Sequence, residues 1–150
     1  MFKQILVPVD GSEPSNNALD TAIALAKHTG GRIRLMHVVD PAVYLMGDPT
    51  GVSTGEMFSS VRDSAMHVLD QGKAAAQAAG LAADHVLIDR VAVRLGDAVA
   101  EAATQWGADL IVVGTHGRRG PSRLLLGSGA EQIIRLAPVR VLVTPARAGS

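Results

Sequence analysis

DLIVVGTHGRRGPSRLLLGSGAE, residues 109–131, is the stretch of this sequence that decides the fold. It begins with the continuous apolar run Leu110 to Val113, which is typical of a strand buried on both faces of a sheet. Gly114 and Gly117 bracket the turn that follows, where the missing Cβ permits positive φ and close approach of a ligand. A second turn, Gly127 to Gly129, leads into a helical pattern. The stretch therefore predicts a strand, a glycine-rich loop and a helix in direct succession.

The start of that helix is predicted to bind an anion. Ser128 and Glu131 have the spacing of a capping box, so the helix is expected to begin there with free backbone N–H groups in its first turn. The loop before it carries Arg118, Arg119 and Arg123. Free N–H groups, the helix dipole and guanidinium groups together favour a phosphate, which we expect one of the three arginines to meet. A purely architectural role for the glycines and for Ser128 stays open.

Balanced charge and the absence of cysteine exclude several classes of protein. Lys and Arg total 14 and Asp and Glu total 14 among 150 residues, so the formal net charge is +0. A general nucleic-acid or anionic-membrane surface would need a basic excess. No Cys is present for disulfides or thiolate metal ligands, and no apolar stretch approaches the length of a membrane span. We expect one soluble cytoplasmic domain, residues 1–150, that contacts neither nucleic acid nor membrane.

The rest of the chain alternates between strand and helix patterns. Strands are expected over residues 5–9, 33–39, 85–93, 110–113 and 139–143. Helices are expected between them, with Ser12 and Asp97 as N-caps of the first and third. This alternation predicts a parallel sheet with helices on both faces. Only Pro41 to Gly55 breaks it, as a long Gly- and Pro-rich segment typical of a lid, a partner contact or disorder.

Unusual residues follow the predicted strands at the edge where open α/β sheets bind ligands. The first strand exits through Pro8-Val9-Asp10 and the second through His37-Val38-Val39-Asp40. Asp10 is suited to a ribose hydroxyl pair and equally to a turn or helix cap. His37 and His116 have no second ligand at metal spacing, so core or rim positions are favoured for both. No catalytic residue and no metal site are predicted.

Taken together, these segments resemble the universal stress protein family over nearly the full length of the chain. The resemblance runs from ILVPVDGS at residues 5–12 to PVRVLV at residues 138–143. The nucleotide-binding branch of that family is marked by Gly, two residues, Gly, nine residues, Gly, then Ser or Thr. Gly114, Gly117, Gly127 and Ser128 fit this spacing without a gap. A pattern of this length, between a strand and a helix, is far more specific than a lone glycine motif.

The resemblance implies a Rossmann-like α/β domain that binds ATP on a five-stranded parallel sheet of order 3-2-1-4-5. Pro8, Asp10 and Val38 are then expected at the adenine and ribose end, and Gly127 to Gly129 at the phosphates. Gly129 stands where family members often carry a side chain, which makes the turn more flexible. The complete set of implied nucleotide-binding residues is Pro8, Val9, Asp10, Val38, Val113, Gly114, Gly117, Arg118, Gly127, Ser128 and Gly129.

A homodimer is also implied, formed by antiparallel pairing of the last strand across a two-fold axis. An apolar edge strand left open is a liability in itself, which favours the same conclusion. The residues concerned are Val139, Arg140, Val141, Leu142 and Val143.

The leading functional hypothesis is an ATP-dependent stress-response switch in which the nucleotide orders Pro41 to Gly55 and shifts the population of a partner-binding surface. A slow ATPase, with His116 orienting a water molecule, is one alternative. A nucleotide-free interaction protein is another. AMP or cyclic AMP in place of ATP, and a need for Mg²⁺, both stay open.

Overall fold

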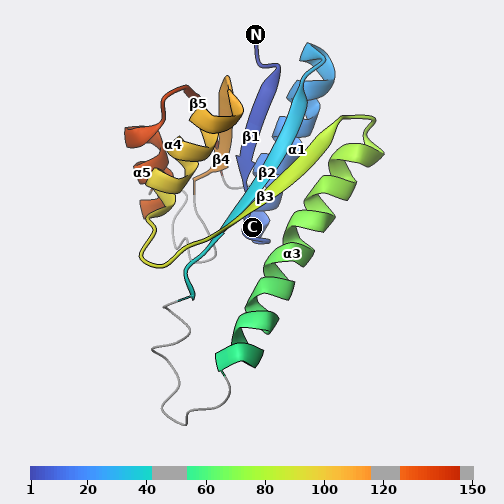
Figure 1. Ribbon diagram of the computed structural model, residues 1–150. Helices are drawn as coiled ribbons and strands as arrows, with labels where there is room; N and C mark the ends of the chain where they lie inside the picture. Colours follow the sequence, from blue (N-terminus) through green and yellow to red (C-terminus); the bar gives the residue numbers. More distant parts are fainter. Residues whose placement is uncertain (42–53, 116–125, 146–150) are drawn as a thin grey trace.

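The computed structural model describes residues 1–41, 54–115 and 126–145, without the side chains of residues 54–57. Strands and helices alternate along the chain, as predicted (Figure 1). The elements are β1 (Gln4–Pro8), α1 (Glu13–Thr29), β2 (Arg32–Val39), α3 (Thr54–Ala78), β3 (Ala83–Asp89), α4 (Leu95–Trp106), β4 (Leu110–Gly114), α5 (Ser128–Leu136) and β5 (Arg140–Thr144).

The five strands form one parallel sheet of order β3-β2-β1-β4-β5, which confirms the expected order. Helices α1 and α3 cover one face, and α4 and α5 cover the other (Figure 1). Successive residues of β1 point to opposite faces, so Ile5 and Val7 enter the core beneath α1 and α3, while Leu6 enters the core beneath α4 and α5. All three are fully buried. Two-sided burial explains why the central strands read as continuous apolar runs.

The predicted N-cap of α1 is confirmed, and a left-handed residue ends the helix. Ser12 is the N-cap, and its Oγ accepts a hydrogen bond from the Ser15 N–H at 3.3 Å. Gly30 ends the helix with a left-handed φ of 70°, which glycine adopts without a Cβ clash. Pro8, expected at a strand exit, is the last residue of β1.

The third strand differs from its prediction because its neighbour sets where it ends. It spans Ala83–Asp89 instead of residues 85–93. Asp89 pairs with Val39, the last residue of β2, so no ladder partner exists beyond it. The chain then turns through Ala92, which has a φ of 60° and donates its N–H to Asp40 Oδ2 at 2.9 Å. The apolar alternation that suggested a longer strand belongs to this turn.

Helix α4 begins before the predicted cap. Its N-cap is Arg94, and Asp97 lies in the first turn, where a carboxylate meets the positive end of the helix dipole. The early start follows from a contact with α5. The Gly96 N–H donates to Gln132 Oε1 at 3.2 Å, and a Cβ on Gly96 would lie 2.7 Å from the Gln132 Cβ.

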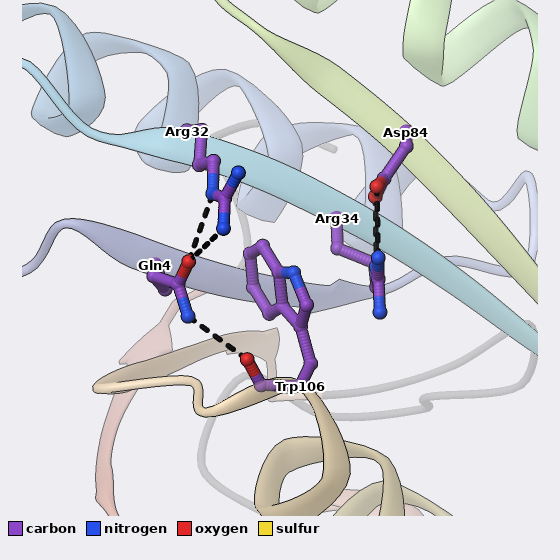
Figure 2. Close-up of polar contacts among 5 residues, drawn as sticks. All are labelled: Gln4, Arg32, Arg34, Asp84 and Trp106. Carbon is purple, nitrogen blue, oxygen red and sulfur yellow. Dashed lines mark hydrogen bonds and ion pairs between the residues drawn. The ribbon is translucent and has the colours of Figure 1, made fainter.

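Trp106, the last residue of α4, holds this helix against the amino-terminal end of the sheet (Figure 2). Its ring lies between two guanidinium groups, with Arg34 at 4.8 Å and Arg32 at 5.7 Å from the ring centroid. Gln4 Nε2 donates to the Trp106 carbonyl at 2.9 Å. Arg34 also pairs with Asp84 at 2.8 Å, and this hydrogen-bonded pair lowers the pKa of the Asp84 carboxyl and raises the pKa of Arg34.

Candidate functional site

A cavity of about 490 Å³ opens at the carboxyl ends of β1, β2 and β4, where the strand order reverses. Ligands of open α/β sheets bind at this position. We call it the main cavity. Gly117 and Arg118 lie outside the described residues, as do Arg119, Arg123 and His116. All the other predicted site residues line the main cavity, namely Pro8, Val9, Asp10, Val38, Val113, Gly114, Gly127, Ser128 and Gly129.

The first turn of α5 forms one wall of the main cavity. Its N-cap is Gly127, whose carbonyl accepts the first intrahelical bond from the Glu131 N–H at 2.9 Å. The N–H groups of Ser128, Gly129 and Ala130 therefore have no intrahelical partner, and no side chain caps the helix. All three residues line the cavity. This wall offers backbone donors and the positive end of a helix dipole, the combination that binds anions.

The predicted capping box is wrong by one residue. Ser128 is the first residue inside the helix, so its hydroxyl does not cap it. A backbone hydrogen bond to the residue after β4 explains why the helix begins at Ser128. The Gly127 N–H donates to the Thr115 carbonyl at 2.6 Å, which holds Gly127 in an extended conformation with φ −64° and ψ 155°. The helix can begin only after it.

Two glycines serve close packing, namely Gly114 at the end of β4 and Gly129 in the first turn of α5. Gly114 was expected to supply a positive φ, but it is a regular strand residue outside the left-handed region. A Cβ there would lie 2.8 Å from the Pro14 carbonyl oxygen, so glycine lets α1 begin directly against β4. A Cβ on Gly129 would lie 2.9 Å from Leu95 Cδ2, at the edge of the main cavity.

Asp10 is a turn residue, as one of its two interpretations had it, and it also lines the main cavity, while its role as a ribose ligand stays a prediction. Its Oδ1 accepts the Ser12 N–H at 2.9 Å, and its own N–H donates to Ser15 Oγ at 3.0 Å. Gly11, with a φ of 81°, supplies the left-handed residue that this turn requires. Ser15 is 7% exposed and lines the cavity. These contacts fix the position of the Asp10 backbone at the edge of the site.

His37 lies at the rim of the main cavity. Its Nδ1 is 2.5 Å from the Val9 carbonyl oxygen. A carbonyl only accepts hydrogen bonds, so Nδ1 is the donor in this contact. Asp40 lines the same rim. Within residues 1–41, 54–115 and 126–145, no group of three His, Asp or Glu side chains is arranged to hold a metal ion.

Sequence reasoning missed five aliphatic residues that line the main cavity, which we call the aliphatic wall. Its members come from β2, the connection between β3 and α4, α4 itself and α5, and none belongs to a sequence motif. They are Met36, Val93, Leu95, Ala130 and Ile133. Ser15 was missed as well, because a serine in a first helical turn looks like any other. The Asp10-Gly11 pair was a usable turn signal. No Lys or Arg occurs among the described residues that line the main cavity.

Comparison with known proteins identifies relatives over almost the whole chain. Residues 1–145 match the profile of the Universal stress protein family. A universal stress protein of Methanocaldococcus jannaschii is 32% identical over 143 residues, covering 95% of this chain and 82% of the relative. A crystal structure of a universal stress protein family member from Burkholderia pseudomallei is 30% identical, with a TM-score of 0.74 and 97% coverage of both chains.

Two further structures share the fold and were solved as nucleotide complexes. One is a universal stress protein in complex with cAMP, with a TM-score of 0.60, 24% identity, and coverage of 97% of this chain and 98% of its own. The other is the universal stress protein from Archaeoglobus fulgidus in complex with dAMP, with a TM-score of 0.67, 19% identity, and coverage of 95% and 98%. No helix in the described part of this chain is long and apolar enough to cross a membrane.

Proposed function

This chain belongs to the universal stress protein family, and from that membership we propose that it binds an adenine nucleotide, ATP, in the main cavity. One observation carries the proposal: the uncapped N-terminus of α5 and the exits of β1, β2 and β4 line a single cavity. The complexes of two relatives of the same fold with cAMP and dAMP support the adenine nucleotide class.

In this proposal the phosphates lie against the first turn of α5. The N–H groups of Ser128, Gly129 and Ala130 are donors that the helix itself does not use. Hydrogen bonds from N–H groups to an anion are shorter and about twice as strong as neutral ones. Since no described lining side chain is cationic, these backbone donors supply most of the recognition within the described wall.

The ribose and base then lie towards the exits of β1 and β2. The Asp10 carboxylate is an acceptor for ribose hydroxyl groups, and its backbone is already fixed by Ser12 and Ser15. The aliphatic wall, with Met36 and Ile133 among its members, suits the flat apolar faces of a purine.

We assign the protein the role of a nucleotide-dependent stress-response switch. Fast phosphoryl transfer needs an oriented water molecule and neutralisation of the phosphate charge, usually by a metal ion and a cationic side chain. The described lining provides backbone donors for binding and no such catalytic set. Residues 42–53 of the segment expected to order on binding lie outside the described residues. Protection of that segment from hydrogen exchange when ATP is added remains the test of its role.

We also propose that the protein acts in the cytoplasm as a single domain and as a homodimer through β5. Strand β5 is one edge of the sheet, and its alternating residues Arg140 and Leu142 are exposed. Leu142 is 37% exposed, so pairing with a second copy would remove apolar surface and satisfy an open edge. Light scattering after gel filtration tests this directly, since a Val141→Pro variant should be monomeric.

Calorimetric titration of nucleotide-stripped protein with ATP, with and without Mg²⁺, tests the central proposal. We expect saturable binding near 1 μM, or about 8 kcal/mol. AMP and cyclic AMP, titrated in parallel, measure how much the outer phosphates contribute. Absence of binding heat and of thermal stabilisation with every nucleotide would contradict the proposal and favour a nucleotide-free interaction protein.

A pair of substitutions at one position separates the backbone donor from the side chain. Ser128→Pro removes the N–H at the first helical position, where proline is well tolerated, and Gly127 before it already has the extended conformation that proline requires. Ser128→Ala removes only the hydroxyl. We expect Ser128→Pro to weaken ATP binding about tenfold and Ser128→Ala much less. Equal losses would place the phosphate on the hydroxyl instead.

A further inference from the structure

The hydrogen-bond ladder between β1 and β2 ends beside the main cavity. The backbone groups of β2 alternate between its two neighbouring strands. Arg32 donates its N–H to the Lys3 carbonyl on the β1 side, at 2.9 Å. Ile33, the next residue, donates to the Ala82 carbonyl on the β3 side, at 3.0 Å. The N–H and carbonyl groups of the even-numbered residues of β2 therefore point towards β1.

Val38, which lines the main cavity, is the even-numbered residue that the ladder leaves out. The regular bonds end with the Val9 N–H, which donates to the Met36 carbonyl at 2.8 Å. In a continued parallel ladder, the Val38 N–H would donate next to the Val9 carbonyl. That bond is not made, because β1 ends at Pro8 and the chain turns away through Gly11, whose φ is 81°. Within the described part of the chain, no backbone group pairs with the Val38 N–H or with its carbonyl.

The His37 side chain supplies the donor that the ladder lacks. Its Nδ1 lies 2.5 Å from the Val9 carbonyl oxygen and donates to it. Val9 is only 6% exposed, and a backbone carbonyl left unpaired in such a position destabilises the fold. The imidazole satisfies this carbonyl, so the ladder can end one bond early. Val38 then keeps its N–H and its carbonyl at the edge of the main cavity.

We propose that His37 is a positioning residue of the nucleotide site. By binding the Val9 carbonyl, it leaves the Val38 N–H and carbonyl available to the base of a nucleotide in the main cavity. This inference rests on the proposed function, which directs the base towards the exits of β1 and β2. Both backbone groups face the same edge of β2, so they offer a donor beside an acceptor. Adenine presents the complementary pair, a ring nitrogen acceptor beside the 6-amino donor, whereas a 6-oxo purine does not.

Hydrogen exchange measured by NMR without nucleotide tests whether His37 holds the ladder open. In the wild type, the Val38 amide should exchange at least about tenfold faster than the Ile33 amide, which is bonded in the β2–β3 ladder. His37→Leu removes the donor, so the Val38 N–H should close onto the Val9 carbonyl and become protected. Protection of the Ile33 amide shows in each variant that the sheet is intact.

His37→Asn is the conservative variant in this experiment. Its Nδ2 is as many bonds from the backbone as Nδ1 of histidine, so it keeps a donor for the Val9 carbonyl. The Val38 amide should then exchange as it does in the wild type. The inference would be overturned by a Val38 amide as protected as Ile33 in the wild type, or by one that gains no protection in His37→Leu.

Calorimetric titration of the same variants tests the link to the base. ITP carries an oxygen where ATP carries the 6-amino group, and the two nucleotides share the ribose and the phosphates. We expect the wild type to bind ATP about tenfold tighter than ITP. His37→Leu should lose most of this preference and bind ATP about tenfold more weakly than the wild type. His37→Asn should retain both properties.

His85→Leu is the matched control, because it removes a second strand imidazole that does not line the main cavity. His85 lies on β3, with its Nε2 3.0 Å from Asp70 Oδ1. Its replacement should leave the affinities for ATP and ITP unchanged. Equal ATP affinity in His37→Leu and the wild type would overturn the inference. Failure of ATP to bind the wild type would overturn the proposed function, and the exchange rates of the Val38 amide would still decide whether His37 holds the ladder open.

Discussion

Helices α1 and α5 both begin beside the carboxyl end of β4, but their N-termini differ in how the backbone N–H groups are satisfied. Helix α1 is closed: Ser12 caps it, Ser15 binds back to the Asp10 N–H, and Pro14 has no N–H to satisfy. Helix α5 is open: Gly127 provides no side chain, and the first-turn donors line the main cavity. The first-turn N–H groups of α1 are therefore used within the protein, whereas those of α5 are left available for a ligand.

The largest expected effect comes from disrupting the close contact between β4 and the N-terminus of α1. Gly114→Ala places a Cβ within 2.8 Å of the Pro14 carbonyl oxygen, which is backbone and cannot rotate away. We expect the free energy of unfolding to fall by about 2 kcal/mol, as for other overpacked sites. Urea denaturation measures it. Gly127→Ala is the control, because its φ of −64° suits any residue, and it should cost less than about 1 kcal/mol. Equal losses would contradict a packing role for Gly114.

Adding a capping side chain to the N-terminus of α5 should weaken ATP binding without lowering the stability of the fold. Gly127→Asp adds a carboxylate that can cap α5 and that interacts favourably with its dipole. We expect the melting temperature to hold or rise, while the affinity for ATP falls about tenfold because the carboxylate competes for the same donors. Differential scanning calorimetry and titration calorimetry provide the two readouts. A loss of stability together with affinity would indicate a misplaced helix instead.

Removing the cap from the closed end should cost stability alone. Ser12→Ala deletes the hydroxyl that accepts the Ser15 N–H, and we expect a loss of about 1 kcal/mol. The matching change Ser128→Ala removes no cap, so its free energy of unfolding should stay within about 0.5 kcal/mol of the wild type. Denaturation curves of the two variants, measured side by side, decide the matter. Similar losses of unfolding free energy in both variants would contradict the conclusion that Ser12 caps α1 and Ser128 does not cap α5.

The smallest effect is expected far from both helix ends. The pairing with Arg34 lowers the pKa of Asp84, so its contribution to stability is present above the unfolded pKa of about 3.9 and is lost as the pH falls through the folded value. The Asp84 side chain is 55% exposed, which limits the contribution to a few tenths of a kcal/mol. Asp84→Asn should remove this part of the acid dependence, seen in unfolding at pH 3 and pH 7, without changing ATP binding.

Features that are set by the local sequence were predicted correctly, whereas features that are set by residues distant in the sequence were not. The central strands were predicted correctly because burial on both faces leaves a continuous apolar run in the sequence itself. The ends of β3 and the caps of α4 and α5 were wrong because Val39, Gln132 and Thr115, all distant in sequence, decide them. The glycine spacing and the strand exits located the cavity. Its aliphatic wall had no motif, since those residues meet only in the folded chain.

The bond between the Gly127 N–H and the Thr115 carbonyl has a consequence for engineering. It holds Thr115, the residue after β4, to the N-cap of α5. Substitutions of Gly117 and Arg118, the expected nucleotide-binding residues between these two positions, should therefore leave the start of α5 in place beside β4. A change of ATP affinity in such variants would then report on the binding groups themselves and not on a displaced helix.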